Sequence, residues 1–342
     1  MNKRRRWILI LGALLLGSSL ACKLLPDPSA YAGNTLSQWM VRLASSVLHS
    51  GLMSADFEVR DKQSTLTATQ AVLHSPPFES RLGAITRGPM VRRRLAIVFT
   101  GHEFAEGAEV ILSALQKHQA KASFFFTGDF LVNTNHQQLL RTLLQNGHYL
   151  GPHSDKHLLY CAWDASRKTL VPREEFKSDL VENLKKIQHL YDSLNIGSHS
   201  LAPRHGQPST QSDSPPSNAY AADRFFLPPY EHYNEQIAGW TRDLGYTLIN
   251  FTAGTRSNAD YTGERDKNFV DSQTIFDSIV AREKKDPHGL NGFLLLLHIG
   301  AGPGRADKFH ARFPELLDYL KARGYDLVRV DELLTGLRAN GL

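Results

Sequence analysis

The chain has 342 residues, of which 42% are hydrophobic and 21% charged, and its formal net charge is +5. This composition is ordinary for a folded globular protein, and the length suits one large domain with appendages or two domains. Part of the positive charge lies in two short runs, residues 3–6 and 92–94, and the sequence has no basic helix with interleaved aromatic residues. The charge therefore does not indicate a nucleic-acid surface, and we expect no nucleic-acid partner.

The first 22 residues have the layout of a bacterial export signal. A basic stretch, residues 3–6, precedes an apolar stretch, residues 7–16, and small residues then lead to Ala21 and Cys22. Ala21-Cys22 also resembles a lipoprotein signal, in which the cysteine is lipidated after cleavage, although Ser19 departs from the usual aliphatic residue. The alternative is an uncleaved anchor, for which the apolar run is short compared with a span of about 20 residues. We expect an exported protein of the cell envelope, on its periplasmic or extracellular face, that meets the membrane through this N-terminal lipid or signal anchor.

The remaining sequence divides by composition. Residues 23–90 form an N-terminal tether and accessory region, in which the apolar spacing at 35–48 predicts a helix. Residues 91–342 form the main domain. Within it, residues 195–222 are rich in Ser, Pro, Asn and Gln and almost lack apolar residues, which predicts a flexible surface insertion.

From residue 95 onward, predicted strands alternate with predicted helices. The strands are expected at 95–99, 122–126, 148–150, 225–227, 246–251, 293–298 and 326–330, and the helices at 108–118, 137–145, 172–191, 272–284, 309–323 and 331–337. Alternation of this kind indicates parallel β-α units, and fully apolar strands indicate a sheet covered on both faces. The fold class is therefore α/β, either a barrel or an open doubly wound sheet. In both, functional side chains gather where strands end.

The stretch Gly147–His157 (GHYLGPHSDKH) contains two histidines, His153 and His157, four residues apart. In a helical turn this spacing places both imidazoles on one side, where they can share a metal ion. The alternative is a strand-to-helix loop with two polar histidines that never meet.

Several blocks together resemble the polysaccharide deacetylase family of carbohydrate esterases, with its NodB-type homology domain. The resemblance covers about residues 95–334, and the matching blocks are LAIVF, KASFFFTG, NGHYLGPHSDKH, FFLPPYEHYN, FLLLLHIG and LKARGYDLVRVDELL. It implies a distorted (β/α) barrel. It also implies an Asp-His-His triad that holds a divalent metal, an Asp base paired to an Arg, and a later His acid. His153 and His157 match the metal histidines, and His298 matches the acid.

Other positions depart from the family pattern. The first motif, usually TFDDG, reads VFTGH at residues 98–102, so both aspartates are absent. In the third motif Leu227 replaces the usual Arg before two prolines, and Glu231 stands where a Gly is expected. The acidic D-x-x-D-W motif reads SNADY at residues 257–261 and keeps only Asp260.

These losses fit either a catalytically inactive protein or an enzyme whose catalytic groups lie one or two residues away from the usual positions. The replacement stretch offers His102 and Glu103, either of which would complete the metal site, and Glu103 or Glu231 would serve as base. The predicted metal ligands are His102, His153 and His157, and the predicted catalytic residues are Glu103, Glu231, His298 and Asp260. Zinc is the expected ion, although nickel, cobalt and manganese also suit such ligands.

Each candidate also has a purely structural interpretation. Glu103 and Glu231 would be acids near a helix N-terminus, favoured by the helix dipole, and His298 a strand-end histidine with a satisfied hydrogen bond. Tyr230 is expected to form a wall of a sugar groove. The remaining histidines His232, His288 and His310 are expected on the surface.

The sequence thus predicts a metal-dependent hydrolase that removes N- or O-linked acetyl groups from a cell-envelope or extracellular polysaccharide. One alternative is a catalytically inactive carbohydrate-binding lipoprotein on the same fold. Another is hydrolysis of a different bond, such as an amide other than an acetamide.

Overall fold

The computed structural model describes residues 78–194 and 224–335 of the chain. All described residues belong to one compact unit, residues 76–342. The predicted signal at 1–22, the predicted helix at 35–48 and the predicted insertion at 195–222 lie outside the described residues. No helix within the described ranges combines the length and the apolarity needed to cross a membrane.

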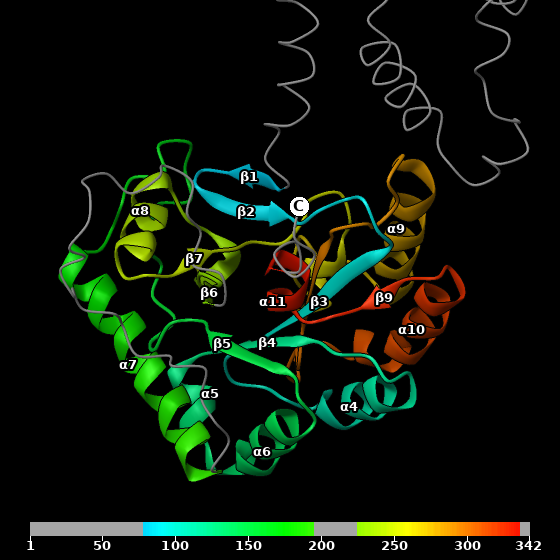
Figure 1. Cartoon of the computed structure of the whole chain (residues 1–342), viewed down its shortest axis with the longest axis horizontal. Coiled ribbons are helices and arrows are strands. Elements are labelled where there is room, and N and C mark those ends of the chain that lie inside the picture. Colours follow the sequence, from blue (N-terminus) through cyan, green and yellow to red (C-terminus); the bar gives the residue numbers. More distant parts are fainter. Residues whose placement is uncertain (1–77, 195–223, 336–342) are drawn as a thin grey trace, which may run out of the picture. The chain divides into compact units, whose positions relative to one another are not determined.

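A five-stranded parallel sheet forms the centre of the domain (Figure 1). Its order is β5 (Tyr149–Pro152), β4 (Ser123–Phe126), β3 (Arg94–Gly101) and β8 (Leu294–His298), and β9 (Asp326–Leu327) pairs with the start of β3. All pairings are parallel, as the alternation of strands and helices predicts.

Successive residues of β3 pack into different apolar clusters. Leu95, Ile97 and Phe99 contribute to the cluster between the sheet and the helices outside it. Ala96 and Val98 contribute to a second cluster, on the inner face of the sheet, which the short strands described below close into a ring. Side chains alternate between the faces of a strand, so both faces of β3 are buried, as its continuous apolar sequence predicts.

Four short strands lie beside this sheet. β6 (Phe225–Phe226) and β7 (Thr247–Leu248) form a parallel pair, and β1 (Glu79–Arg81) and β2 (Ala84–Arg87) form an antiparallel hairpin.

Single backbone contacts join these pieces into a ring. The backbone N–H that follows β6 donates to the carbonyl of Pro152 at 3.3 Å, which links β6 to β5. An isolated bridge between Ile85 and Ile249 links β2 to the end of β7, and another between Arg87 and Phe293 links β2 to the start of β8. Among the described residues the strand ladder is not continuous around the ring. The fold is the distorted (β/α) barrel that the sequence resemblance implies, and the open doubly wound alternative is not realised.

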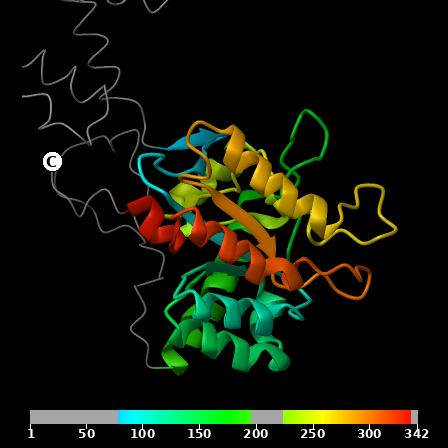
Figure 2. The same cartoon turned by 90° about the vertical axis from the view of Figure 1, so that its right-hand side faces the viewer.

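Helices cover the outside of the strands. In the 90° view of Figure 2, the orange strand β8 runs between α9 and α10, whose apolar side chains share its core cluster. The helices are α4 (Ala108–Lys117), α5 (Gly128–Val132), α6 (Gln137–Gln145), α7 (Arg173–Ser193), α8 (Glu235–Asp243), α9 (Ser272–Lys285), α10 (Phe313–Ala322) and α11 (Val330–Thr335). Short 3-10 turns occur at Thr134–His136, Pro229–Glu231, Ser257–Ala259 and Phe309–Arg312.

Some predicted elements are wrong at their ends. The strands expected at 246–251 and 326–330 shorten to two residues each, β7 and β9. The helix expected at 309–323 divides into a 3-10 turn and α10, because Pro314 lacks a backbone N–H and suits the first turn of a helix. The helix expected to begin near Tyr233 is α8, which begins at Glu235. Asn234 caps it by accepting a hydrogen bond from the backbone of Ile237 at 2.9 Å.

The hairpin β1–β2 packs with the main sheet. It lies in the same compact unit as that sheet, residues 76–342, and Ile85 is buried among the side chains inside the ring. In the sequence these residues, 79–87, precede the expected start of the main domain at residue 91.

Candidate active site

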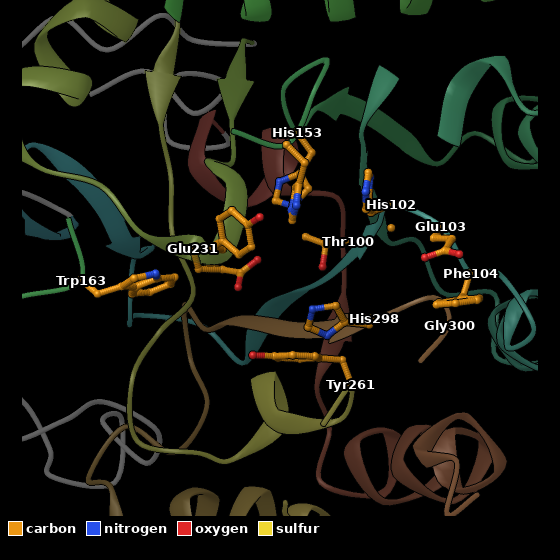
Figure 3. Close-up of a pocket in the computed structure, with 13 residues that line it drawn as sticks. Thr100, His102, Glu103, Phe104, His153, Trp163, Glu231, Tyr261, His298 and Gly300 are labelled. Carbon is orange, nitrogen blue, oxygen red and sulfur yellow. The ribbon is translucent and has the colours of Figure 1, made fainter. Parts of the chain in front are cut away.

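The pocket opens where β3 and β8 end (Figure 3). Its volume is about 280 Å³, and all seven predicted site residues except Asp260 line it directly. The lining residues are Thr100, Gly101, His102, Glu103, Phe104, His153, His157, Trp163, Tyr230, Glu231, Tyr261, His298 and Gly300. Function at strand ends was predicted, and this placement brings together side chains from distant parts of the chain.

The histidine stretch 153–157 is not helical, so the predicted helical turn is wrong. Ser154 and His157 have positive φ angles of 71° and 54°. These strained conformations persist because α7 fixes the loop from outside. The Asp179 carboxylate accepts the backbone N–H groups of residues 155 and 156 at 3.0 and 2.7 Å, and the Asn183 amide donates to the Ser154 carbonyl at 2.6 Å. His153 and His157 nevertheless meet, with ring centroids 5.2 Å apart.

Burial keeps this histidine pair neutral. Desolvation lowers the pKa of His153 well below its ordinary value, and neighbouring imidazoles, first that of His157, lower it further. Desolvation also lowers the pKa of His157 to about 4, with His102 and His298 contributing. His153 Nδ1 lies 2.9 Å from the carbonyl oxygen of Leu227. A carbonyl only accepts, so Nδ1 carries the proton and the lone pair of Nε2 is free.

The three predicted metal ligands do not form one site. His102 stacks on His157 with centroids 4.7 Å apart and only 14° between the ring planes. A metal ion bound to an imidazole nitrogen lies near the plane of that ring at about 2.0–2.1 Å, so two parallel stacked rings cannot share an ion. In residues 78–194 and 224–335, no group of three or more His, Cys, Asp or Glu side chains is arranged to hold a metal ion. The prediction of His102 as the third ligand is therefore wrong for this arrangement. His153 and His157, with planes 52° apart, remain a half-site.

His298 and Asp260 form a close pair at the floor of the pocket. His298 Nδ1 donates to Asp260 Oδ1 at 2.6 Å, and the backbone N–H of His298 donates to Oδ2 at 2.8 Å. Asp260 is buried, with 4% of its surface exposed. Burial alone would lower the pKa of His298, but the charge and hydrogen bond of Asp260, with a contribution from Glu231, leave that pKa raised. Asp260 thus acts through His298. The purely structural interpretation of His298, a strand-end histidine with a satisfied hydrogen bond, does not account for this charged partner.

Glu231 enters the pocket from a strained turn. Tyr230 and Glu231 both have positive φ angles, 59° and 51°. The Asn250 amide donates to the Glu231 carbonyl at 2.8 Å and helps to hold this turn. Burial raises the pKa of Glu231 to about 7, while His298 lowers it and Asp260 raises it. Helix α8 begins only at Glu235, so Glu231 is not the helix N-terminal acid of the structural interpretation.

Glu103 differs from Glu231 in its surroundings. It is exposed, and Figure 3 shows it at the rim beside His102, on the side of the pocket away from Glu231. Helix α4 begins at Ala108, so Glu103 does not lie in its first turn either. Both candidate bases therefore line the pocket, but only Glu231 is partly buried and electrostatically coupled to His298.

Exposed aromatic side chains surround the pocket. Trp163, Tyr261 and Tyr230 are 62%, 48% and 43% exposed, and all three line it. Tyr230 packs on His157 with centroids 4.3 Å apart, which agrees with its expected place in the wall. Trp163 was not predicted, and its only signal in the sequence is a tryptophan six residues after His157.

The Trp163 ring rests on His232, with centroids 4.3 Å apart. His232 is buried, and its Nε2 lies 2.9 Å from the carbonyl oxygen of Ala162. The expectation that His232 is a surface residue is therefore wrong, because it supports the loop that carries Trp163.

Comparisons with known proteins agree with the motifs and the fold. Residues 89–213 match the family model described as polysaccharide deacetylase. Over this stretch the chain is similar to the polysaccharide deacetylase family. A search of curated proteins found no match.

Three solved structures that resemble this chain are distant from it in sequence. PdaA of Bacillus subtilis, a family 4 carbohydrate esterase, is 18% identical with a TM-score of 0.51, and the match covers 76% of this chain and 87% of PdaA. The Bc1960 peptidoglycan N-acetylglucosamine deacetylase is 17% identical with a TM-score of 0.51, covering 73% and 91%. A family 4 pseudoenzyme from Bacillus anthracis, BA3943, is 16% identical with a TM-score of 0.49, covering 74% and 69%. At these identities the likeness to the first two structures shows the fold alone, and the chemistry of this chain has to be inferred from its own residues.

Proposed function

We propose that the chain is a hydrolase that removes N- or O-linked acetyl groups from a polysaccharide. The observation that supports it most strongly is the combination, in one pocket, of Glu231 with a pKa raised to about 7 and His298 paired to a buried Asp260. Hydrolysis of an acyl group needs a base for the attacking water and an acid for the leaving atom, and both work best with pKa values near the working pH. Figure 3 shows these two side chains facing one another across the pocket.

In this mechanism Glu231 is the base and His298 the acid. The ionised Glu231 takes a proton from water while the water oxygen attacks the acyl carbon. The bond from that carbon to the sugar nitrogen or oxygen then breaks, and His298 Nε2 gives its proton to the leaving atom. Asp260 holds the Nδ1 proton and stabilises the charged imidazolium, so the proton that leaves is the one on Nε2. The products are acetate and the free amine or hydroxyl.

A glycan is proposed as the substrate because of the aromatic rim. Trp163, Tyr230 and Tyr261 present large exposed faces beside the reacting groups. Isolated exposed aromatic residues are common, but three around one pocket are typical of a binding site. Aromatic faces pack on the apolar faces of sugar rings, so the rim suits a chain of several sugars.

The only support for metal dependence in the described residues is the pair of metal-ligating side chains His153 and His157. The family is generally metal-dependent, and a divalent ion there would polarise the acyl carbonyl. Because the described residues do not complete a three-ligand site, the steps above use only the side chains of this chain. We propose that this chain binds zinc through His153 and His157 and not through His102.

We also propose that the protein acts in the cell envelope. The proposal depends on the export or lipoprotein signal at residues 1–22 and places the domain on the periplasmic or extracellular face. Lipid labelling of Cys22 tests it directly, since a Cys22→Ser variant should lose the label.

The alternative is a non-catalytic glycan-binding protein on the same fold. It is favoured by the loss of both aspartates from residues 98–102 and by the stacked His102, which prevents a complete metal site. Binding needs only the aromatic rim, which is intact.

Acetate release separates these two functions. Purified protein is incubated with acetylated chitotetraose and with acetylated xylan, with zinc added, and acetate is measured for the wild type, Glu231→Gln and Glu109→Gln. Glu109 is exposed on α4 and serves as the matched control. Release by the wild type and the control, with loss of about 10²-fold or more in Glu231→Gln, supports the hydrolase. Binding of either glycan without any acetate release supports the alternative.

A further inference from the structure

Thr100 has an unusual hydroxyl group. Its side chain is 2% exposed, and its Oγ1 is buried without a hydrogen-bond partner in the described structure. Seven buried side-chain atoms of the described residues lack a partner, and among them only Thr100 Oγ1 belongs to a residue that lines the pocket. A buried hydroxyl without a partner is unfavourable, so such a group in a pocket points to an outside partner.

The position of Thr100 follows from the alternation of β3. Ala96 and Val98, two and four residues earlier, point into the cluster inside the ring of strands, and Thr100 continues that row at the open end. On β8, Leu296 points into the same cluster, and His298 continues its row at the open end. The strands are parallel and in register, with Thr100 opposite His298. The apolar interior therefore ends in two polar side chains, side by side at the floor of the pocket.

An apolar residue would suit this position better if only packing mattered. Valine has nearly the same shape as threonine and equal preference for a strand, and it would leave no polar atom unpaired. Figure 3 shows the Thr100 hydroxyl directed into the space between Glu231 and His298. This is where the acyl group must lie if water activated by Glu231 attacks it and His298 protonates the leaving atom.

We propose that the Thr100 hydroxyl donates a hydrogen bond to the acyl oxygen of the substrate during hydrolysis. This oxygen gains negative charge when water attacks, so a fixed donor stabilises it more in the transition state than in the bound substrate. Thr100 would then be a catalytic residue that supplies part of the stabilisation expected from a metal ion elsewhere in the family. The proposal rests on the proposed hydrolase function.

The test uses Thr100→Val, which removes only the hydroxyl, and Thr100→Ser, which keeps it. We expect kcat for acetate release from acetylated chitotetraose to fall about 10²-fold in Thr100→Val with little change in KM, and to recover largely in Thr100→Ser. The melting temperature of Thr100→Val should equal or exceed that of the wild type, because no protein hydrogen bond is lost.

Thr241→Val is the matched control. Thr241 is fully buried in α8, and its hydroxyl donates to the Ile237 carbonyl at 2.8 Å. That variant should show the opposite signature, a lowered melting temperature with an unchanged kcat. A wild-type kcat in Thr100→Val, an effect on KM alone, or a melting temperature lowered as in Thr241→Val would each overturn the proposal.

A second readout separates this proposal from the hydrolase function. A phosphonamidate analogue of acetylated chitotetraose, whose charged oxygen resembles the acyl oxygen of the transition state, should raise the melting temperature of the wild type and of Thr100→Ser, and should do so less for Thr100→Val. If the wild type releases no acetate, the hydrolase function fails, and that pattern of shifts still supports the contact to the acyl oxygen. Equal shifts in all three proteins, or none in the wild type, would overturn it.

Discussion

Asp260 contacts His298 twice, through Nδ1 at 2.6 Å and through the backbone N–H at 2.8 Å, so one buried carboxylate fixes both the ring and the strand end that carries it. The role of general acid proposed for His298 depends on this arrangement. An asparagine at position 260 would keep one hydrogen bond but would remove the charge that stabilises the imidazolium.

We therefore predict that Asp260→Asn lowers kcat for acetate release by about 10²-fold or more and lowers the pKa of His298. Kinetics measure the first effect, and a histidine NMR titration measures the second. Asp318→Asn is the control, since Asp318 lies on the surface in an ion pair with Lys117 and 3.1 Å from His118 Nε2. An unchanged pKa of His298 in Asp260→Asn would show that the pair does not set the proton affinity of the ring.

The aromatic rim gives a prediction about substrate length. Replacing Trp163 with Ala removes the largest exposed face beside the pocket and should raise KM for acetylated chitotetraose about 10-fold, since one stacked ring contributes roughly 1–2 kcal/mol. Leu170→Ala is the control, because Leu170 is similarly exposed at 53% but does not line the pocket. Equal KM values in the two variants would remove Trp163 from the binding site.

Metal content tests the arrangement of the histidines. After purification with added zinc, elemental analysis should find zinc in the wild type and in His102→Ala and little in the His153→Ala/His157→Ala double variant. The reason is that the His153 and His157 rings meet at 52°, whereas His102 lies stacked on His157 with only 14° between the ring planes. Loss of zinc in His102→Ala would show instead that its stacking on His157 rearranges when the metal binds.

Acid should destabilise the domain through His148. This side chain is 6% exposed, its Nδ1 accepts the backbone N–H of Ala122 at 3.3 Å, and burial, with the charges of Lys121 and Arg329, lowers its pKa to about 4. A lowered histidine pKa favours the neutral form in the folded state. Its contribution is complete above the unfolded pKa of 6.5 and is lost as the pH falls towards about 4.

The expected loss of unfolding free energy from His148 over this interval is on the order of 3 kcal/mol, from 1.36 kcal/mol per pKa unit. Denaturant unfolding at a series of pH values measures it. His148→Asn should flatten the pH dependence, whereas His189→Asn, on the exposed side of α7, should not. The same slope in His148→Asn and in the wild type would assign the acid sensitivity to other groups.

The fold was predicted well where local sequence determines it. Helix α6 has the predicted bounds, because its apolar residues recur at helical spacing and Gly147, with a φ of 72°, ends it. Strands β3 and β8 were found because their apolar runs are buried on both faces. The two-residue strands β7 and β9 were overestimated, since pairing with distant strands, rather than local propensity, sets their length.

Six of the seven residues predicted for the site line one pocket, but the geometry of that pocket was not predicted. The loops that carry His157 and Glu231 are held by partners on other elements, Asp179 and Asn250, which local sequence does not reveal. Threonine is an ordinary strand residue, so nothing in the sequence marks the unpaired hydroxyl of Thr100.

The pH dependence of kcat/KM for acetate release, compared between the wild type and Glu231→Gln, tests the proposed chemistry most directly. For the wild type we predict a rise as the pH increases through about 7, where Glu231 loses its proton, and a fall where His298, whose pKa is raised above its ordinary value, loses its own. Glu231→Gln should be at least about 10²-fold less active and should lack the rising limb. A rising limb that survives unchanged in Glu231→Gln would contradict the assignment of Glu231 as the base.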